Sequence, residues 1–289
     1  MSILYDLPLP RAAAASSRRC LLALLASPLA AKIPARARPD LLPTISSYRR
    51  RASAWFKFQE ATDDAIQLGF KNGSVTSKQL VVFYLDRIAC LDPHLHTVIE
   101  VNPDALAQAA RTDAERASGR HGCGGPLHGV PVPLKDNIAM HDRLNTTAGS
   151  LAMLGSVVRR DAGVAARLRA AGAIILGKNN PTEWSAFRDN NVPRGWSARG
   201  GQTLQSVCGI VHEEHVRSAT LCWSSSCSAV AAAANLAAVT LGTETDGSIL
   251  CPTSLNSMVR IKPTVGLTSR AGVIPITPRR DTVGVASAF

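Results

Sequence analysis

The sequence predicts one α/β domain in which helices pack in layers against a mostly buried sheet. Segments with apolar residues at helical spacing alternate along the chain with short apolar runs. The short runs contain few polar residues, which is typical of strands buried on both faces. The chain of 289 residues is 46% hydrophobic, enough to build a substantial core. No internal repeat is visible.

Two helices are expected in the first part of this domain. The first covers 60–70 and ends near Gly73. The second begins at the capping box Thr76-Ser77-Lys78-Gln79 and continues through Ile88. Apolar residues of the second helix recur at helical spacing and are assigned to the core: Leu80, Val81, Tyr84, Leu85 and Ile88.

The later elements alternate between helix and strand. They are a helix from Asn102-Pro103 through Ala117, a strand over 130–134, a helix over 164–171, a strand over 173–176 and an alanine-rich helix over 229–238. Asp161 and Ser226 are expected to cap the last two helices, and Gly172 to end the first of these.

A serine follows a glycine in the short polar turn Gly242-Thr243-Glu244-Thr245-Asp246-Gly247-Ser248-Ile249. Upstream lie the triple serine Ser224-Ser225-Ser226 and a lysine, Lys135, at the end of an apolar run. A serine hydroxyl is a poor nucleophile until a neighbour takes its proton, and a lysine can take it only when burial keeps the amine neutral. These segments together predict a hydrolase that works without histidine.

Each segment also has an ordinary structural interpretation. A Gly-Ser pair is usually a turn, a lysine at the end of a strand is usually solvated, and triple serines commonly cap a helix. Their joint occurrence in this order, with Ser224 and Ser248 24 residues apart, favours the catalytic interpretation.

These segments resemble the amidase signature family, whose catalytic unit is Ser–cis-Ser–Lys. Carried over by position, the resemblance implies Ser248 as the nucleophile, Ser224 as the bridging serine and Lys135 as the base. It extends from about 58 to 284 and is closer to plant and fungal amidases than to the subunits that amidate glutamyl-tRNA. The implied fold has a mixed central sheet flanked by helices.

The resemblance implies hydrolysis of a linear carboxamide to an acid plus ammonia or an amine, through an acyl-enzyme on Ser248. Backbone N–H groups of Thr245, Asp246 and Gly247 are expected to stabilise the oxyanion. No metal and no organic cofactor is implied, and the partner is a small-molecule amide. Fatty amides, indole acetamide-like amides and small aliphatic amides all agree with the sequence, which leaves the oligomeric state open as well.

Five departures from the family pattern leave alternatives open. Trp223 and Cys227 stand where the family usually has glycine, and Leu250 stands where many members have arginine. An atypical insert covers 205–222, and 53–289 reads as a partial amidase domain that lacks the C-terminal part. A catalytically inactive remnant is therefore one alternative, and a glutamyl-tRNA amidotransferase-like subunit is a weaker one.

Charge is concentrated near the N-terminus. Residues 1–52 carry a net charge of +7 out of the total of +11. Residues 53–289 carry the remaining +4 and contain no run of basic residues, which argues against a nucleic-acid partner. Residues 1–52 read as a targeting segment, either a secretory signal or an organellar transit peptide. No later stretch is long and apolar enough to span a membrane.

The seven cysteines are odd in number and scattered, and no disulfide framework is expected. A group in the insert has zinc-ligand residue types, but its spacing matches no reliable motif: Cys208, His212, His215 and Cys222. No metal site is therefore predicted.

Overall fold

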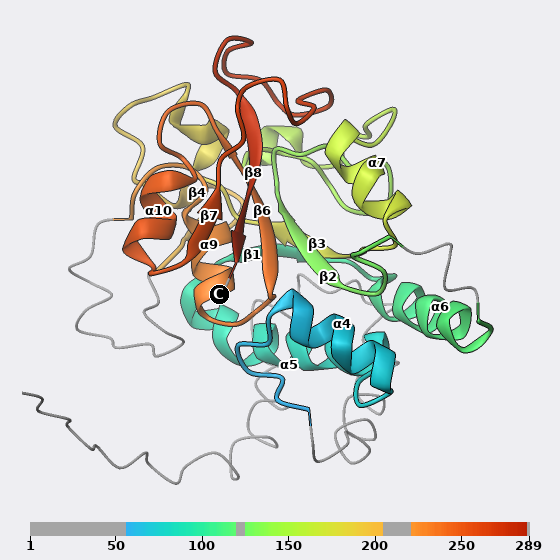
Figure 1. Ribbon diagram of the computed structural model, residues 1–289. Coiled ribbons are helices and arrows are strands. Elements are labelled where there is room, and N and C mark those ends of the chain that lie inside the picture. Colours follow the sequence, from blue (N-terminus) through green and yellow to red (C-terminus); the bar gives the residue numbers. More distant parts are fainter. Residues whose placement is uncertain (1–55, 120–124, 205–220, 288–289) are drawn as a thin grey trace, which may run out of the picture.

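The structure, a computed structural model, describes residues 56–119, 125–204 and 221–287 (Figure 1). The expected targeting segment, 1–52, and residues 205–220 of the atypical insert lie outside the described residues. Within these ranges, no helix has both the length and the apolar character needed to cross a bilayer.

A six-stranded sheet forms the centre of the fold, with the strand order β1-β3-β2-β6-β8-β7. The strands are β1 (Val98–Val101), β2 (Pro131–Lys135), β3 (Ile174–Asn179), β6 (Val239–Glu244), β7 (Val259–Ile261) and β8 (Thr282–Ser287). Strands β3, β2 and β6 are parallel neighbours, while the outer pairs are antiparallel. The mixed sheet is thus confirmed. A short hairpin of β4 (Trp196–Ser197) and β5 (Gly201–Gln202) lies outside it.

Helices flank this sheet, as Figure 1 shows. They are α4 (Asp63–Asn72), α5 (Ser77–Leu95), α6 (Ala105–Ala117), α7 (Gly163–Ala170), α9 (Ser226–Ala233) and α10 (Leu250–Leu255), with 3-10 turns η2 (Leu151–Met153) and η3 (Glu183–Ala186). Helix α9 packs against β2, β3, β6 and β8, whereas α6 and α7 contact β3. The predicted layered α/β arrangement is therefore observed.

The capping box of the second helix is confirmed, but the helix is longer than predicted. Thr76 and Gln79 exchange side-chain and backbone hydrogen bonds at the start of α5. The helix continues to Leu95, which is fully buried. Asp92 stabilises its end, because the carboxylate accepts a hydrogen bond from the backbone nitrogen of Thr97 at 2.6 Å.

Two predicted helix caps are wrong. Helix α7 follows Ala162, and Asp161 instead accepts a hydrogen bond from the backbone nitrogen of His141 and pairs with Arg169 at 2.9 Å. Ser226 lies inside the first turn of α9, where its hydroxyl donates to the carbonyl oxygens of the two residues at 222 and 223. Asp161 therefore lies one residue before the N-cap of α7, and Ser226 lies one residue after the N-cap of α9, Ser225.

The predicted buried strand that ends in Lys135 is confirmed as β2. Every residue of β2 and β3 is buried, and Lys135 pairs in register with Asn179. Strand β3 is longer than expected and continues to Asn179. Because β2, β3 and β6 are parallel, their carboxyl ends meet at one edge of the sheet, where the candidate site lies.

Candidate active site

The structure brings Lys135, Ser224 and Ser248 together at this edge. Lys135 is the last residue of β2, Ser224 lies just before α9, and Ser248 follows the turn after β6. Lys135 Nζ is 2.7 Å from Ser224 Oγ, and Ser224 Oγ is 2.9 Å from Ser248 Oγ. The exposed fractions of the three residues are 0%, 1% and 4%. The two serines and the lysine thus form a continuous chain of short polar contacts within the protein.

Burial sets the ionisation of the lysine. Loss of water lowers the pKa of Lys135 from 10.5 to about 7, against the opposing effect of acidic groups that include Glu244 and Asp281. Burial therefore favours the neutral amine at a pH well below that at which an exposed lysine loses its proton.

Two further hydroxyl groups, to which no sequence motif assigns a role, complete the surroundings of the amine. Ser225 Oγ and Thr243 Oγ1 each lie 3.0 Å from Lys135 Nζ. Ser225 Oγ donates its own proton to the carbonyl oxygen of Thr243 at 2.8 Å, so toward Lys135 it acts as an acceptor. Asn137 Nδ2 donates to Thr243 Oγ1 at 2.9 Å. Lys135 Nζ also donates to Ser224 Oγ, so three hydroxyl oxygens surround the amine as acceptors.

The turn before Ser248 has the backbone conformation that its glycine permits. Gly247 has a φ of +77°, in the left-handed region. Glu244 fixes the other side of the turn by accepting hydrogen bonds from the backbone nitrogens of Ile249 and Leu250 at 2.6 and 2.8 Å. Among the described atoms, none accepts a hydrogen bond from the backbone nitrogen of Asp246 or Gly247.

Trp223 lies directly against this turn. Its indole Nε1 is 3.1 Å from the position that a Cβ atom at Gly247 would occupy. The backbone of Trp223 has a φ of +55°, and its bond to Ser224 is a trans peptide, unlike the cis bond that the resemblance implies. The guanidinium of Arg194 lies 4.7 Å from the centre of the Trp223 ring. The glycine-to-tryptophan departure therefore falls beside the candidate nucleophile.

Cysteines at the site behave differently from one another. Cys227, at the second glycine position of the family, is buried within α9, and burial raises the pKa of its thiol to about 12. Cys222 and Cys251 form a disulfide, with Cα atoms 5.7 Å apart. An odd, scattered cysteine set does not predict a disulfide, and this pairing depends on the fold that brings the Ser224 and Ser248 segments together.

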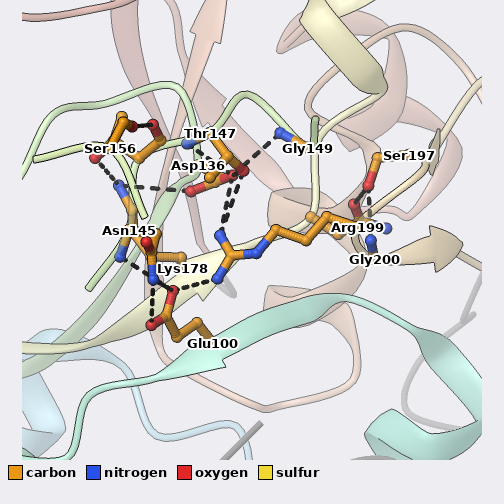
Figure 2. A network of polar contacts seen from close by, with 12 residues as sticks. Glu100, Asp136, Asn145, Thr147, Gly149, Ser156, Lys178, Ser197, Arg199 and Gly200 are labelled. Atoms are coloured by element: carbon orange, nitrogen blue, oxygen red, sulfur yellow. Dashed lines mark hydrogen bonds and ion pairs between the residues drawn. The ribbon is translucent and has the colours of Figure 1, made fainter. Parts of the chain in front are cut away.

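A network of buried charges lies on the neighbouring strand ends (Figure 2). Asp136 Oδ2 accepts hydrogen bonds from the backbone nitrogens of Thr147 and Gly149 at 3.2 and 3.1 Å. Arg199 lies between two carboxylates: Nη1 is 3.6 Å from Asp136, and Nη2 pairs with Glu100. Burial raises the pKa of Asp136, while the nearby cations Lys178 and Arg199 oppose this.

This network ties together β1, the end of β2, β3 and the segment that carries Arg199. It therefore fixes the sheet edge immediately after Lys135. No motif of the sequence indicates the network.

In the described part of the chain, no group of histidine, cysteine and acidic residues has a metal-binding arrangement. Cys222 has a zinc-ligand residue type but is in the disulfide. The other three residues of that group lie outside the described residues: Cys208, His212 and His215.

A buried lysine in contact with a serine, which in turn contacts a second serine in a glycine turn, defines a serine–serine–lysine cluster on an α/β sheet. The family model for Amidase matches residues 79–288, and the chain belongs to this family.

Relatives support the same assignment. A probable amidase of Arabidopsis thaliana is 55% identical over 239 residues, which cover 83% of this chain and 45% of that protein. The crystal structure of a peptide amidase from Stenotrophomonas maltophilia superposes with a TM-score of 0.73 at 48% identity, covering 81% of this chain and 46% of that one. The chain thus spans less than half the length of these relatives.

Proteins of tRNA-dependent amidation are less similar. A glutamyl-tRNA(Gln) amidotransferase subunit from Methylobacillus flagellatus is 38% identical over 211 residues, which cover 73% of this chain and 40% of that protein. The predicted closer relationship to plant-type amidases is confirmed.

Proposed function

We propose that the chain is an amidohydrolase that cleaves a linear carboxamide through an acyl-enzyme on Ser248. The observation that carries this proposal is the buried path from Lys135 Nζ to Ser224 Oγ at 2.7 Å and on to Ser248 Oγ at 2.9 Å. It gives a serine hydroxyl a route to an amine that burial keeps partly neutral at pH 7.

The positions of the hydroxyl groups around the amine support Lys135 as the base. A neutral amine has two N–H bonds and one lone pair. In the structure Lys135 Nζ donates to Ser224, Ser225 and Thr243. In the neutral amine of the proposal, Ser225 and Thr243 accept the two remaining N–H bonds, and the lone pair is left for Ser224. In the structure Ser224 accepts from Lys135 and donates to Ser248. In the reaction both directions reverse: Ser224 donates its proton to Lys135 and accepts the proton of Ser248.

The proposed reaction has two stages. Ser248 Oγ bonds to the amide carbon as its proton passes to Ser224, whose own proton passes to Lys135. The oxyanion is stabilised by N–H groups of the turn over Thr245, Asp246 and Gly247. The C–N bond then breaks, and the proton returns along the same path to the leaving ammonia or amine. In the second stage, water attacks the acyl carbon and releases the acid and free Ser248.

The first substrates to test are peptides with a C-terminal carboxamide, since one similar structure is a peptide amidase. Ammonia release from such a peptide, from a fatty amide and from a small aliphatic amide is measured with the full chain. Turnover of any of these that disappears in Ser248→Ala supports the proposal. Equal turnover by the parent and Ser248→Ala contradicts it.

A second candidate, a catalytically inactive family member, is favoured by the position of Trp223. The indole lies against Gly247, in the turn that would have to receive the oxyanion, and Ser248 is almost fully buried. Trp223→Gly distinguishes the two candidates. Turnover that appears only in this variant supports the inactive member, whereas turnover in the parent supports the amidohydrolase.

A further inference from the structure

The disulfide joins the two segments that carry Ser224 and Ser248. Cys222 lies two residues before Ser224, and Cys251 lies three residues after Ser248, in the first turn of α10. The sequence separation of the two cysteines is 29. The disulfide is therefore a covalent link across the serine pair of the candidate site.

Hydrogen bonds accompany this link, among them two between Ser225 Oγ and the backbone of Thr243 at 2.8 and 3.2 Å. Ser224 Oγ and Ser248 Oγ are 2.9 Å apart, while the backbone nitrogens of Ser225 and Ser224 reach the Ser248 carbonyl and hydroxyl oxygens at 3.2 and 3.4 Å. The last two distances are longer than the usual 2.9–3.0 Å of an N–H···O bond. The disulfide is the covalent connection between these segments, and the hydrogen bonds closest to the Ser224–Ser248 backbone are long.

Trp223 concentrates backbone strain between Cys222 and Ser224. Its φ of +55° lies in a region that bulky residues rarely occupy. Such a conformation persists only where the surroundings fix it. Here the Trp223 carbonyl accepts hydrogen bonds from Thr182 and Ser226 at 3.3 and 2.8 Å, and the disulfide fixes the residue before it.

We propose that the Cys222–Cys251 disulfide is a redox lock that holds Ser224 in line between Lys135 and Ser248. This inference rests on the proposed function. When the disulfide is reduced, the backbone at Trp223 relaxes, and the Ser224 hydroxyl moves out of its position between Lys135 and Ser248. The proposed nucleophile then loses its proton acceptor.

A dithiol reductant balances the step. One of its thiolates attacks a sulfur of the disulfide, the S–S bond breaks, and one cysteine leaves as a thiol while the other forms a mixed disulfide with the reductant. The second thiol of the reductant then attacks its own sulfur in the mixed disulfide and releases the second cysteine. Two electrons and two protons are transferred in total. The chain retains two thiols, and the reductant becomes a disulfide.

The surroundings of the cysteines suit this exchange. Cys222 and Cys251 are partly exposed, whereas Cys227 is buried. Because burial raises the pKa of Cys227 to about 12, its thiol stays protonated at neutral pH and does not compete for the disulfide.

The test follows labelling of the full chain by a fluorophosphonate, with and without dithiothreitol, by intact mass. Peptide mapping reports which cysteines are reduced. Reduction of the 222–251 bond is expected to slow labelling by roughly 10- to 100-fold, the effect of misplacing a reacting group by about 1 Å. Reoxidation is expected to restore the rate.

Two variants control this experiment. The double variant Cys222→Ser/Cys251→Ser is expected to label slowly whether or not dithiothreitol is present. Cys90→Ser changes a cysteine of α5 that is not part of the 222–251 bond, and this variant is expected to respond as the parent does. An unchanged labelling rate in parent chains whose 222–251 bond is reduced overturns the proposal.

If the oxidised parent does not label at all, the proposed function fails, and the lock is judged by amide hydrogen exchange. Faster exchange over 221–226 on reduction, absent from the double variant, supports a lock on the Ser224 segment. Equal exchange in the two redox states overturns it.

Discussion

Lys135 and Ser224 lie 89 residues apart in the chain, yet the amine of one is 2.7 Å from the hydroxyl of the other, and neither is exposed to solvent. A buried amine at this distance from a hydroxyl gives the proposed reaction a distinctive dependence on pH.

The first prediction concerns the pH dependence of nucleophile reactivity. Only the neutral form of Lys135 accepts a proton, and its pKa is about 7. The rate of fluorophosphonate labelling is therefore expected to rise about tenfold per pH unit below pH 7 and to level off above it. Lys135→Met is expected to lose most of the labelling at every pH. A parent rate that is flat from pH 5.5 to 8.5 contradicts the role of Lys135 as base.

The second prediction concerns stability. The pKa of Lys135 is about 7 in the folded chain but ~10.4 when unfolded, so the unfolded chain binds more protons between these values. The free energy of unfolding therefore rises with pH in this interval, by up to about 1.4 kcal/mol per pH unit from this residue. This contribution is absent well below pH 7 and complete above ~10.4.

Urea unfolding of the parent and Lys135→Met at pH 7 and 8.5 measures this effect. The variant is expected to show a smaller rise in the free energy of unfolding than the parent, because it lacks the amine of Lys135. Lys178, whose pKa is lowered to about 8, contributes equally to both chains and cancels in the comparison. Equal rises in the two chains would show that the pKa of Lys135 is not lowered.

Much of the fold follows from the sequence because its signals are local. The alternation of helical and apolar segments predicts the layered domain, and the apolar run before Lys135 predicts β2. The capping box at Thr76 marks the start of α5. The cap assigned to Asp161 is wrong because the carboxylate has a stronger partner, Arg169, which only the tertiary structure brings within reach.

The candidate site can be predicted only where its residues belong to recognisable motifs. The Ser248 turn, the serine run and Lys135 stand out as motifs, and the structure brings them together. Thr243 lies within the same turn motif but has no chemical signal of its own. The pair Glu100–Arg199 joins residues 99 positions apart, and no local pattern indicates such a contact.

The third prediction concerns Trp223. Replacing it with glycine removes the indole from Gly247 and relieves the left-handed backbone strain. Trp223→Gly is expected to label with the fluorophosphonate about tenfold faster or more than the parent, since the turn that receives the oxyanion becomes accessible. Trp223→Phe keeps an aromatic ring there and is the matched control. A slower rate in Trp223→Gly would show that the indole supports the site.

The fourth prediction concerns the buried charges of Figure 2. Asp136→Asn leaves Arg199 and Lys178 with less compensating charge inside the protein, and is expected to lower the free energy of unfolding by about 3–5 kcal/mol. Asp104→Asn is the control, because Asp104 pairs with Arg143 at the surface, where their side chains are 43% and 59% exposed. The free energy of unfolding is expected to fall by only about 0–1 kcal/mol in Asp104→Asn. Equal losses in the free energy of unfolding of the two variants would contradict the stabilising role of the buried charges.

The central claim is that Ser248 is an activated nucleophile. Intact mass of the full chain after exposure to a fluorophosphonate tests it most directly, with Ser248→Ala and Ser254→Ala alongside. Ser254 is an exposed serine of α10 and serves as the matched control. We expect one adduct on the parent and on Ser254→Ala, and none on Ser248→Ala. Folded parent without an adduct, or an adduct that persists in Ser248→Ala, would contradict the claim.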